Sequence, residues 1–180
     1  MAFPFSLLKR KDVDNMGFFS KLFSKAEKIN DNHIYAPMAG QAVPVTEVPD
    51  PTFAEGMLGN GIAIIPADGK LYAPCNGTVT MMFETGHALT LTSNAGAEIL
   101  IHVGLETVGL GGKPFKPAVK AEEKVKKGQL LMEVDLEMIK EAGLNTITPM
   151  LICNSDEYSK FNTNVGKEVT NADVVIELGK

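Results

Sequence analysis

The sequence predicts an all-β fold, an antiparallel β-sandwich or barrel with one or two short helices, and three observations lead to this prediction. From about residue 33 onward, apolar residues occur in short runs separated by Gly, Pro, Asn and Asp, the pattern of strands joined by turns. One short motif occurs twice, and helical periodicity is convincing in only one segment of this body. With 44% apolar and 22% charged residues, a chain of 180 residues can bury a substantial core.

The first 32 residues are predicted to form a flexible extension that differs from the body in charge. Six basic and three acidic side chains give residues 1–30 a net charge of +3, whereas 11 basic and 19 acidic side chains give the remaining 150 residues a net charge of −8. In segment 17–28, phenylalanine and leucine recur at helical spacing and lysine occupies the other face. This pattern suits an amphipathic helix on an anionic membrane surface, but it also suits a tail whose aromatic side chains pack against the body or a partner.

The composition also limits the compartment and the partners. No apolar stretch approaches the roughly 18 residues needed to span a bilayer, and the segment before Lys9 is too short for the core of a signal peptide. Met16 is a second candidate translation start. Cys75 and Cys153 fit a reducing compartment and are expected to be small, buried residues. Only Arg10 among the 17 basic residues is an arginine, so a nucleic-acid partner is not expected.

Short apolar runs predict the strands in the central part of the body. In chain order, the runs are Ile62–Ile65, Leu71–Ala73, Thr78–Phe83, His87–Thr92 and Ile99–Val103. Asp68–Gly69 and Asn76–Gly77 supply tight turns between them, and Gly128–Gln129 is expected to form another strand-to-strand turn. The only helical pattern in the body covers Leu136–Ala142, and Gly143 is a suitable stop.

A repeated heptapeptide indicates that the fold is duplicated. Residues Ile34–Gly40 recur 37 positions later as Leu71–Gly77, with Tyr, Ala, Pro and Gly identical at the same offsets. Pro and Gly restrict or permit particular backbone conformations, so equal offsets indicate the same strand-to-turn geometry in both places. We therefore expect two similar β units packed into one sandwich.

Two histidines are the main candidates for chemistry. His87 and His102 lie in neighbouring predicted strands, and a loop centred between Asn94 and Ala95 would place them directly opposite each other, with Cβ atoms about 5 Å apart. A shift of one residue in register would break this pairing. Facing imidazoles could bind a metal, share a proton, or act as nucleophile and helper, and they could also be two ordinary surface histidines. A catalytic zinc would need a third protein ligand, and the remaining histidine, His33, is expected to lie in the linker.

The residues around these histidines resemble a known family. Gly96–Val108 is similar to the phosphorylation-site signature of the glucose-family enzyme IIA component of the bacterial phosphoenolpyruvate-dependent sugar phosphotransferase system, and Phe83–Ala88 resembles its second histidine motif. Further matches are Val48–Asp50 with Phe53, Gly59–Ile64, and Thr148–Pro149 leading to Asn154. The resemblance runs from Ile34 to Glu177, so residues 33–180 are expected to form this family's domain, an antiparallel sandwich built from a duplicated motif.

The resemblance implies a role for each residue of the site. His102 would receive a phosphoryl group from the phosphohistidine carrier protein HPr and pass it to a cysteine in the IIB domain of a glucose-type sugar permease. His87 would hydrogen-bond the phosphate, and Thr85 would orient His87. The only group carried would be the transient phosphate on His102, with no further cofactor. The protein would then be cytoplasmic. If segment 17–28 forms the membrane-binding helix described above, the protein would be peripheral at the inner face of the plasma membrane.

The same resemblance indicates a docking surface for the partners. Phe53, Leu58, Phe83 and Val108 correspond to apolar residues around the histidines, although each is also a candidate core residue. Gly104 would leave room at the rim for a partner. Glu106 stands where the best-known members carry aspartate. Residues 33–112 contain one lysine and seven acids, which complements a basic phosphocarrier.

Two other functions compete with phosphotransfer. One is a regulatory or binding module in which His87 and His102 hold zinc at an interface. The other is a biotinyl or lipoyl carrier domain, with Lys140 as the modified lysine. Against the carrier, Ile139 separates Met138 from Lys140, and the surrounding residues are predicted to form a helix instead of a hairpin tip.

Overall fold

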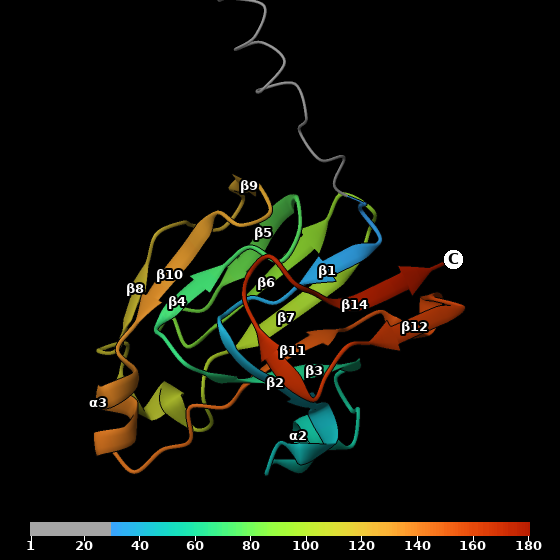
Figure 1. Ribbon diagram of the computed structural model, residues 1–180. Coiled ribbons are helices and arrows are strands. Elements are labelled where there is room, and N and C mark those ends of the chain that lie inside the picture. The colour runs from blue at the N-terminus through green and yellow to red at the C-terminus, as the bar shows by residue number, and fades with distance from the viewer. Residues whose placement is uncertain (1–29) are drawn as a thin grey trace, which may run out of the picture.

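A computed structural model of the chain describes residues 30–180 (Figure 1), so the predicted amphipathic segment at 17–28 lies outside the described residues. The described part is built mainly from strands. They are β1 (His33–Tyr35), β2 (Gly40–Pro44), β3 (Asn60–Pro66), β4 (Lys70–Tyr72), β5 (Gly77–Met82), β6 (Ala88–Ser93), β7 (Glu98–His102), β8 (Phe115–Pro117), β9 (Lys124–Val125), β10 (Leu130–Val134), β11 (Thr148–Ile152), β12 (Lys160–Thr163), β13 (Lys167–Val169) and β14 (Val174–Gly179).

Helices are short in the described part of the chain. The α-helices are α2 (Pro51–Ala54) and α3 (Leu136–Glu141), and three single 3₁₀ turns are η1 (Val45–Glu47), η2 (Thr107–Leu110) and η3 (Ser155–Glu157). Asp135 caps α3 by accepting a hydrogen bond from the Met138 N–H, and Gly143 follows the helix in the left-handed conformation, as predicted for its end. None of the described helices is long and apolar enough to cross a membrane.

The strands form three antiparallel sheets. An eight-stranded sheet has the order β13-β2-β3-β11-β7-β6-β5-β9, and two three-stranded sheets have the orders β1-β14-β12 and β4-β10-β8. The prediction of an antiparallel all-β sandwich is therefore confirmed, and each predicted strand lies within two residues of an observed one. In Figure 1, α2 and α3 lie at one end of the molecule, and the described chain begins at the opposite end.

The duplication is visible in the sheet order and in a pair of reciprocal hydrogen bonds. The large sheet consists of two equivalent halves, β13-β2-β3-β11 and β9-β5-β6-β7, and each half has its own three-stranded sheet. Tyr35 N–H donates to the Pro74 carbonyl at 2.9 Å, and Tyr72 N–H donates to the Pro37 carbonyl at 2.7 Å. These are equivalent positions of the repeated heptapeptide, so the two bonds are related by a pseudo-twofold axis. One unit, β4–β10, is continuous in sequence, and it is inserted into the other, which comprises β1–β3 and β11–β14.

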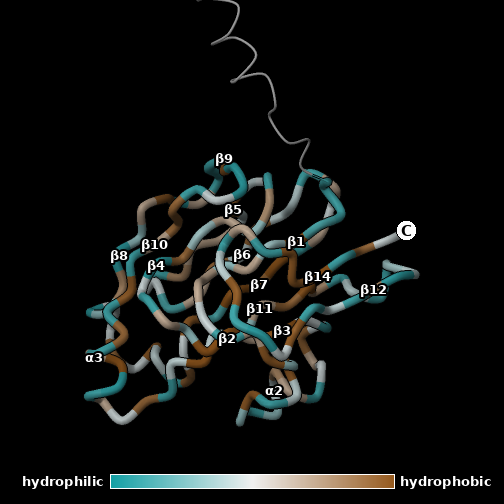
Figure 2. The backbone as a smooth tube through the Cα atoms, viewed as in Figure 1, coloured by the Kyte–Doolittle hydropathy of each residue, from teal (hydrophilic) through white to brown (hydrophobic). Residues whose placement is uncertain are grey.

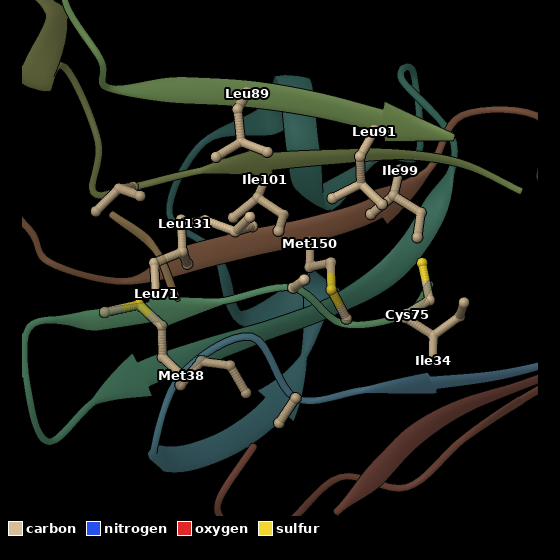
Figure 3. Packing of buried hydrophobic residues seen from close by; sticks show 14 of the residues in the cluster. Ile34, Met38, Leu71, Cys75, Leu89, Leu91, Ile99, Ile101, Leu131 and Met150 are labelled. Atoms are coloured by element: carbon tan, nitrogen blue, oxygen red, sulfur yellow. The ribbon is translucent and has the colours of Figure 1, made fainter. Parts of the chain in front are cut away.

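The main core lies between the large sheet and the two small ones (Figure 3). The repeated heptapeptide contributes equivalent buried residues from both units, Ile34 with Leu71 and Met38 with Cys75. The large sheet adds alternate side chains, among them Leu89, Leu91, Ile99, Ile101 and Met150. Figure 2 shows the same division, with hydrophobic residues concentrated on the inner strands and hydrophilic residues on β9 and the outer loops.

A second, smaller cluster lies on the other face of the large sheet and supports the histidine site. Its members are Val43, Val48, Phe53, Ala63, Leu105, Ile147 and Leu151, with Val45 and Leu100 packed against them. Ala63 and Leu151 alternate along β3 and β11 with residues of the main core, so they point to the opposite face. This cluster anchors α2 and the loop after β7 to the sheet.

Two local predictions are wrong. His33 lies in β1, where it pairs with Glu177, and not in a linker. Cys153, which directly follows the last residue of β11, is exposed. Cys75 is buried as predicted, and burial raises the pKa of its thiol to about 12. Both thiols are free.

Candidate active site

His102 is the last residue of strand β7, and one of its ring nitrogens already has a hydrogen-bond partner. Its Nδ1 lies 2.7 Å from the carbonyl oxygen of Gly104, two residues along the chain. A carbonyl oxygen can only accept a hydrogen bond, so Nδ1 carries the proton and donates it. The neutral imidazole then has its lone pair on Nε2. The local backbone therefore selects Nε2 as the nucleophilic atom of this ring.

The predicted register of the histidine hairpin is wrong by one residue. His102 pairs with Ala88 and not with His87. The reason is the length of the loop: residues 94–96 form a three-residue turn, closed by a hydrogen bond from Ser93 N–H to the Ala97 carbonyl at 2.9 Å. Gly96 supplies the left-handed residue with φ +91°, as is common in loops of this length.

The two histidine rings nevertheless lie together, because His87 belongs to a turn and not to a strand. Strand β6 begins at Ala88, and the preceding turn is closed by a hydrogen bond from Gly86 N–H to the Phe83 carbonyl at 2.7 Å. The strict alternation of a strand does not apply there. The ring centroids of His87 and His102 are 5.0 Å apart, with 74° between the ring planes. The backbone also joins them, since Val103 N–H donates to the His87 carbonyl at 2.8 Å.

Neighbouring side chains hold both rings. Thr85 Oγ1 lies 2.5 Å from Nδ1 of His87. The Phe83 ring meets the edge of His87 at a centroid distance of 5.3 Å, and the Phe53 ring lies 5.2 Å from that of His102. Each histidine thus has its Nδ1 bonded and one side of its ring covered. Among the described residues, neither Nε2 has a hydrogen-bond partner.

The surroundings favour neutral imidazoles. Burial lowers the pKa of His102 below its ordinary value of 6.5, and this effect outweighs the Gly104 carbonyl and the Asp50 carboxylate, which both raise it. Burial also lowers the pKa of His87, and the proximity of His102 lowers it further. Both rings are therefore predominantly uncharged at pH 7, which leaves a lone pair for attack on an electrophile.

Gly104 does not leave room for a partner, so that expectation is wrong. The residue is buried with φ +71°, and a Cβ built on it would lie 2.6 Å from Thr107 Cγ2 and 2.8 Å from the Asn145 carbonyl oxygen. Glycine is needed here because the left-handed backbone and the close packing exclude a side chain. Its contribution to the site is its carbonyl, which bonds to His102.

The expected docking residues differ in their exposure. Leu58, Phe83 and Val108 are 39%, 37% and 53% exposed, and Glu106 is also at the surface. Phe53 is only 5% exposed, so it supports His102 from within the smaller cluster and is not part of the surface. Met57, next to Leu58 in the chain, is 72% exposed. It was not predicted as a docking residue, because an isolated methionine in a loop gives no sequence signal of its own.

Two residues that were predicted only as motif matches, Asp50 and Asn154, make contacts that bear on the histidines or on their hairpin. Asp50 caps α2 by accepting a hydrogen bond from Thr52 N–H, and its carboxylate raises the pKa of His102. Asn154 accepts a hydrogen bond from Glu98 N–H at 2.9 Å and donates to the Gly96 carbonyl at 3.0 Å. It therefore ties the end of β11 to the hairpin that carries both histidines.

Neither competing function is favoured over phosphotransfer. Within residues 30–180, no group of three or more His, Cys, Asp or Glu side chains is placed to hold a metal ion. A zinc ion on His87 and His102 would therefore need ligands from another molecule. Lys140 lies on α3 with its Nζ 2.8 Å from Glu137 Oε1, and not at a hairpin tip as in a biotinyl or lipoyl carrier.

Comparison with known proteins gives consistent matches. The family model described as "phosphoenolpyruvate-dependent sugar phosphotransferase system, EIIA 1" matches residues 32–158. The glucose-specific EIIA component of Bacillus cereus is 43% identical over 152 residues, which cover 84% of this chain and 92% of that protein. The glucose-specific EIICBA component of Staphylococcus saprophyticus is also 43% identical, but the match covers 22% of that longer protein. The solved structure of glucose permease IIA from Mycoplasma capricolum superposes with a TM-score of 0.75 at 34% identity, covering 80% of this chain and 93% of that one.

Proposed function

The chain belongs to the EIIA 1 family of the phosphoenolpyruvate-dependent sugar phosphotransferase system, and from this premise we propose that His102 carries the phosphoryl group on Nε2. The protein is a phosphotransferase component, a phosphocarrier in sugar uptake. The observation that supports the site is the 2.7 Å hydrogen bond between His102 Nδ1 and the Gly104 carbonyl, which leaves the Nε2 lone pair available beside His87. The phosphate is the only group that this transfer requires the protein to carry.

The accepting step needs little chemistry beyond alignment. The Nε2 lone pair of His102 attacks the phosphorus of phosphorylated HPr, and the N–P bond to the donor's histidine breaks as that imidazole leaves with its electron pair. The proton on His102 Nδ1 stays in its bond to Gly104. Phosphoryl transfer depends mainly on positioning and on charge stabilisation at the phosphoryl oxygens, and no acid or base has to act in this step.

His87 is proposed to stabilise the phosphoryl oxygens. If the Thr85 hydroxyl donates to Nδ1 of His87, the proton of that ring sits on Nε2 and can be donated to a phosphoryl oxygen. The two histidines are then opposite tautomers. The Gly104 carbonyl makes His102 a nucleophile at Nε2, and the Thr85 hydroxyl makes His87 a hydrogen-bond donor at Nε2. Both roles use neutral rings, in agreement with the lowered pKa values.

The second transfer goes to the IIB domain of a glucose-type permease. The thiolate of the IIB cysteine attacks phosphorus, an S–P bond forms, and His102 leaves as a neutral imidazole that regains its lone pair. The glucose specificity is proposed from the names of the relatives, which are glucose-specific components. The docking surface is assigned to the exposed residues Met57, Leu58, Phe83 and Val108, with Glu106 facing basic groups of HPr.

Incubation with phosphoenolpyruvate, enzyme I and HPr tests the function. We expect the wild-type protein to gain about one acid-labile, alkali-stable phosphate per chain, which is the behaviour of a phosphohistidine. NMR of ¹⁵N-labelled protein should place it on His102 Nε2. A wild-type protein that gains no phosphate would refute the phosphocarrier function, and phosphate on Nδ1 would refute the assignment of the tautomer.

The rate of acceptance should depend on pH through the nucleophile. Because the pKa of folded His102 lies below its ordinary value of 6.5, the rate should be close to its maximum at neutral pH and above, and it should fall as the pH drops through the lowered pKa. Stability should change in the same direction. Between the folded pKa and 6.5 the unfolded chain binds more protons, so the free energy of unfolding decreases as the pH falls through that window. Transfer rates measured together with His102 NMR titrations check the first expectation, and urea unfolding at several pH values checks the second. A rate that rises on acidification would contradict a neutral nucleophile.

Segment 17–28 is proposed to bring the protein to the inner face of the plasma membrane from the cytoplasm. The support is its sequence, in which phenylalanines and lysines fall on opposite faces of a helical pattern. Full-length protein should sediment with vesicles containing phosphatidylglycerol and not with neutral phosphatidylcholine vesicles. Replacement of Lys21, Lys25 and Lys28 by glutamine should reduce this binding several-fold; equal binding to both vesicle types would refute the membrane role.

A further inference from the structure

We propose that the buried hydroxyl of Thr107 is a positioning group for His102: it fixes the loop whose carbonyl holds the histidine in its reactive tautomer. The inference rests on the proposed function for its kinetic consequence. Its structural basis, the tautomer of the unphosphorylated ring, is independent of that function.

The orientation of the Gly104 carbonyl decides which nitrogen of His102 is reactive. Gly104 lies between two peptide planes, one shared with Val103 and one shared with Leu105. Its φ of +71° is one that glycine adopts at no steric cost, and glycine also has the widest range of alternative conformations. A carbonyl in such a flexible position points reliably at His102 Nδ1 only if both neighbouring planes are held.

Each of the two planes is held by one hydrogen bond. Thr107 Oγ1 donates to the Val103 carbonyl at 2.6 Å, which fixes the plane before Gly104. Leu105 N–H donates to the Asn145 carbonyl at 2.9 Å, which fixes the plane after it. In a trans peptide the N–H and the C=O point in opposite directions, so holding Leu105 N–H directs the Gly104 carbonyl the other way, toward His102.

Thr107 is suited to this task by its burial and by both branches of its side chain. It is 0% exposed, and its Cγ2 is the atom closest to the place where a Cβ on Gly104 would stand. The methyl group therefore fills the space beside Gly104 while the hydroxyl reaches back to residue 103. Val103 is held on its other side as well, because its N–H donates to the His87 carbonyl. Thr107 thus acts on a residue, Val103, whose own N–H is bonded to the backbone of His87.

Two substitutions separate the hydroxyl from the methyl group. Thr107→Val keeps the shape and the contact with Gly104 but removes the donor, and Thr107→Ser keeps the donor but removes the methyl. We expect Thr107→Val to show a mixed tautomer for His102 in two-bond ¹H–¹⁵N NMR spectra and to accept phosphate on the order of tenfold more slowly, with kcat affected and KM for phosphorylated HPr unchanged. Thr107→Ser should retain the wild-type tautomer and most of the rate.

The same change at Thr90 is the matched control. Thr90 lies on β6 and its hydroxyl bonds to Thr80 Oγ1 at 2.8 Å, so Thr90→Val also removes a hydroxyl hydrogen bond from this hairpin. Thr90→Val should leave the tautomer of His102 and the rate of phosphate acceptance unchanged. If Thr107→Val does not fold, Thr107→Ala gives the same NMR comparison with Thr107→Ser.

The outcomes distinguish this inference from the proposed function. A wild-type tautomer and rate in Thr107→Val would overturn the positioning role while leaving phosphotransfer intact. Equal losses in the valine and serine variants, in step with their melting temperatures, would also overturn it, because they would show only a structural contribution. A wild-type protein that accepts no phosphate would refute the proposed function, and the NMR comparison would still decide the role of Thr107.

Discussion

His102→Gln should accept no phosphate, with labelling reduced to about 1% of wild type or less. Phosphoryl transfer to this site requires the Nε2 lone pair, and a glutamine amide nitrogen has none available for attack. His87 is not expected to replace it, because the Thr85 hydroxyl at its Nδ1 favours the tautomer in which Nε2 carries the proton. The measurement is acid-labile ³²P incorporation after incubation with phosphoenolpyruvate, enzyme I and HPr.

His33→Gln provides the control for this substitution. His33 lies in β1, at the opposite end of the molecule from α2 and α3, and among the described side chains its Nε2 has a hydrogen bond only with Asn30. This variant should label like the wild type. The melting temperature of His102→Gln should stay close to the wild-type value, since the ring is only half-buried. Full labelling of His102→Gln would show that the site is assigned to the wrong residue, although the family membership would stand.

The strands that the sequence predicted share a simple local signal. β3, β5, β6 and β7 combine runs of apolar residues with turn residues at both ends, and their boundaries were predicted within two residues. Some strands of residues 115–179 lack this signal. β9 is two residues long and becomes a strand only by pairing with the start of β5, more than 40 positions earlier in the chain. Such strands depend on distant partners, so no local pattern predicts them.

The duplication was predicted, but its arrangement was not. The repeated heptapeptide marks only the beginning of each unit, at Ile34 and Leu71. The later strands of the two units have no visible sequence similarity, and therefore nothing in the chain showed that one unit is inserted into the other. Only the sheet order and the bonds between Tyr35, Pro74, Tyr72 and Pro37 reveal it.

The positions of single side chains in the site were also predicted only in part. That His87 and His102 lie close together was predicted from a register that proved wrong, and a turn, not strand pairing, brings the rings together. Phe53 was a candidate for both the docking surface and the core, and it is buried in a cluster that includes Leu151, almost 100 positions away. Motif similarity identifies which residues matter. Their burial and hydrogen bonds depend on tertiary packing.

His87→Gln should still become phosphorylated but should pass the phosphate to IIB about 100-fold more slowly than the wild type. The two transfer steps differ because their nucleophiles carry different charges. In the accepting step the nucleophile is the neutral imidazole of His102, whereas in the second step a negatively charged thiolate approaches the negatively charged phosphoryl group. A hydrogen bond from His87 Nε2 to the phosphoryl oxygens offsets this repulsion, and the loss of one such donor typically costs 10²–10³-fold in rate.

Glutamine does not replace this donor well, although it carries an amide N–H. Thr85 Oγ1 holds Nδ1 of a planar ring, and the Phe83 ring packs against the same imidazole. A glutamine side chain has an additional rotatable bond and no atom in the position of Nδ1, so its amide is not aimed at the phosphate. Single-turnover transfer from prelabelled protein to a purified IIB domain measures the step directly, while the final extent of labelling measures acceptance. Thr85→Val, which keeps His87 but removes its oxygen partner, should be slowed less, by roughly tenfold. Wild-type transfer by His87→Gln would show that the phosphoryl oxygens are stabilised by the partner and not by this chain, and the nearness of the two rings would then need another explanation.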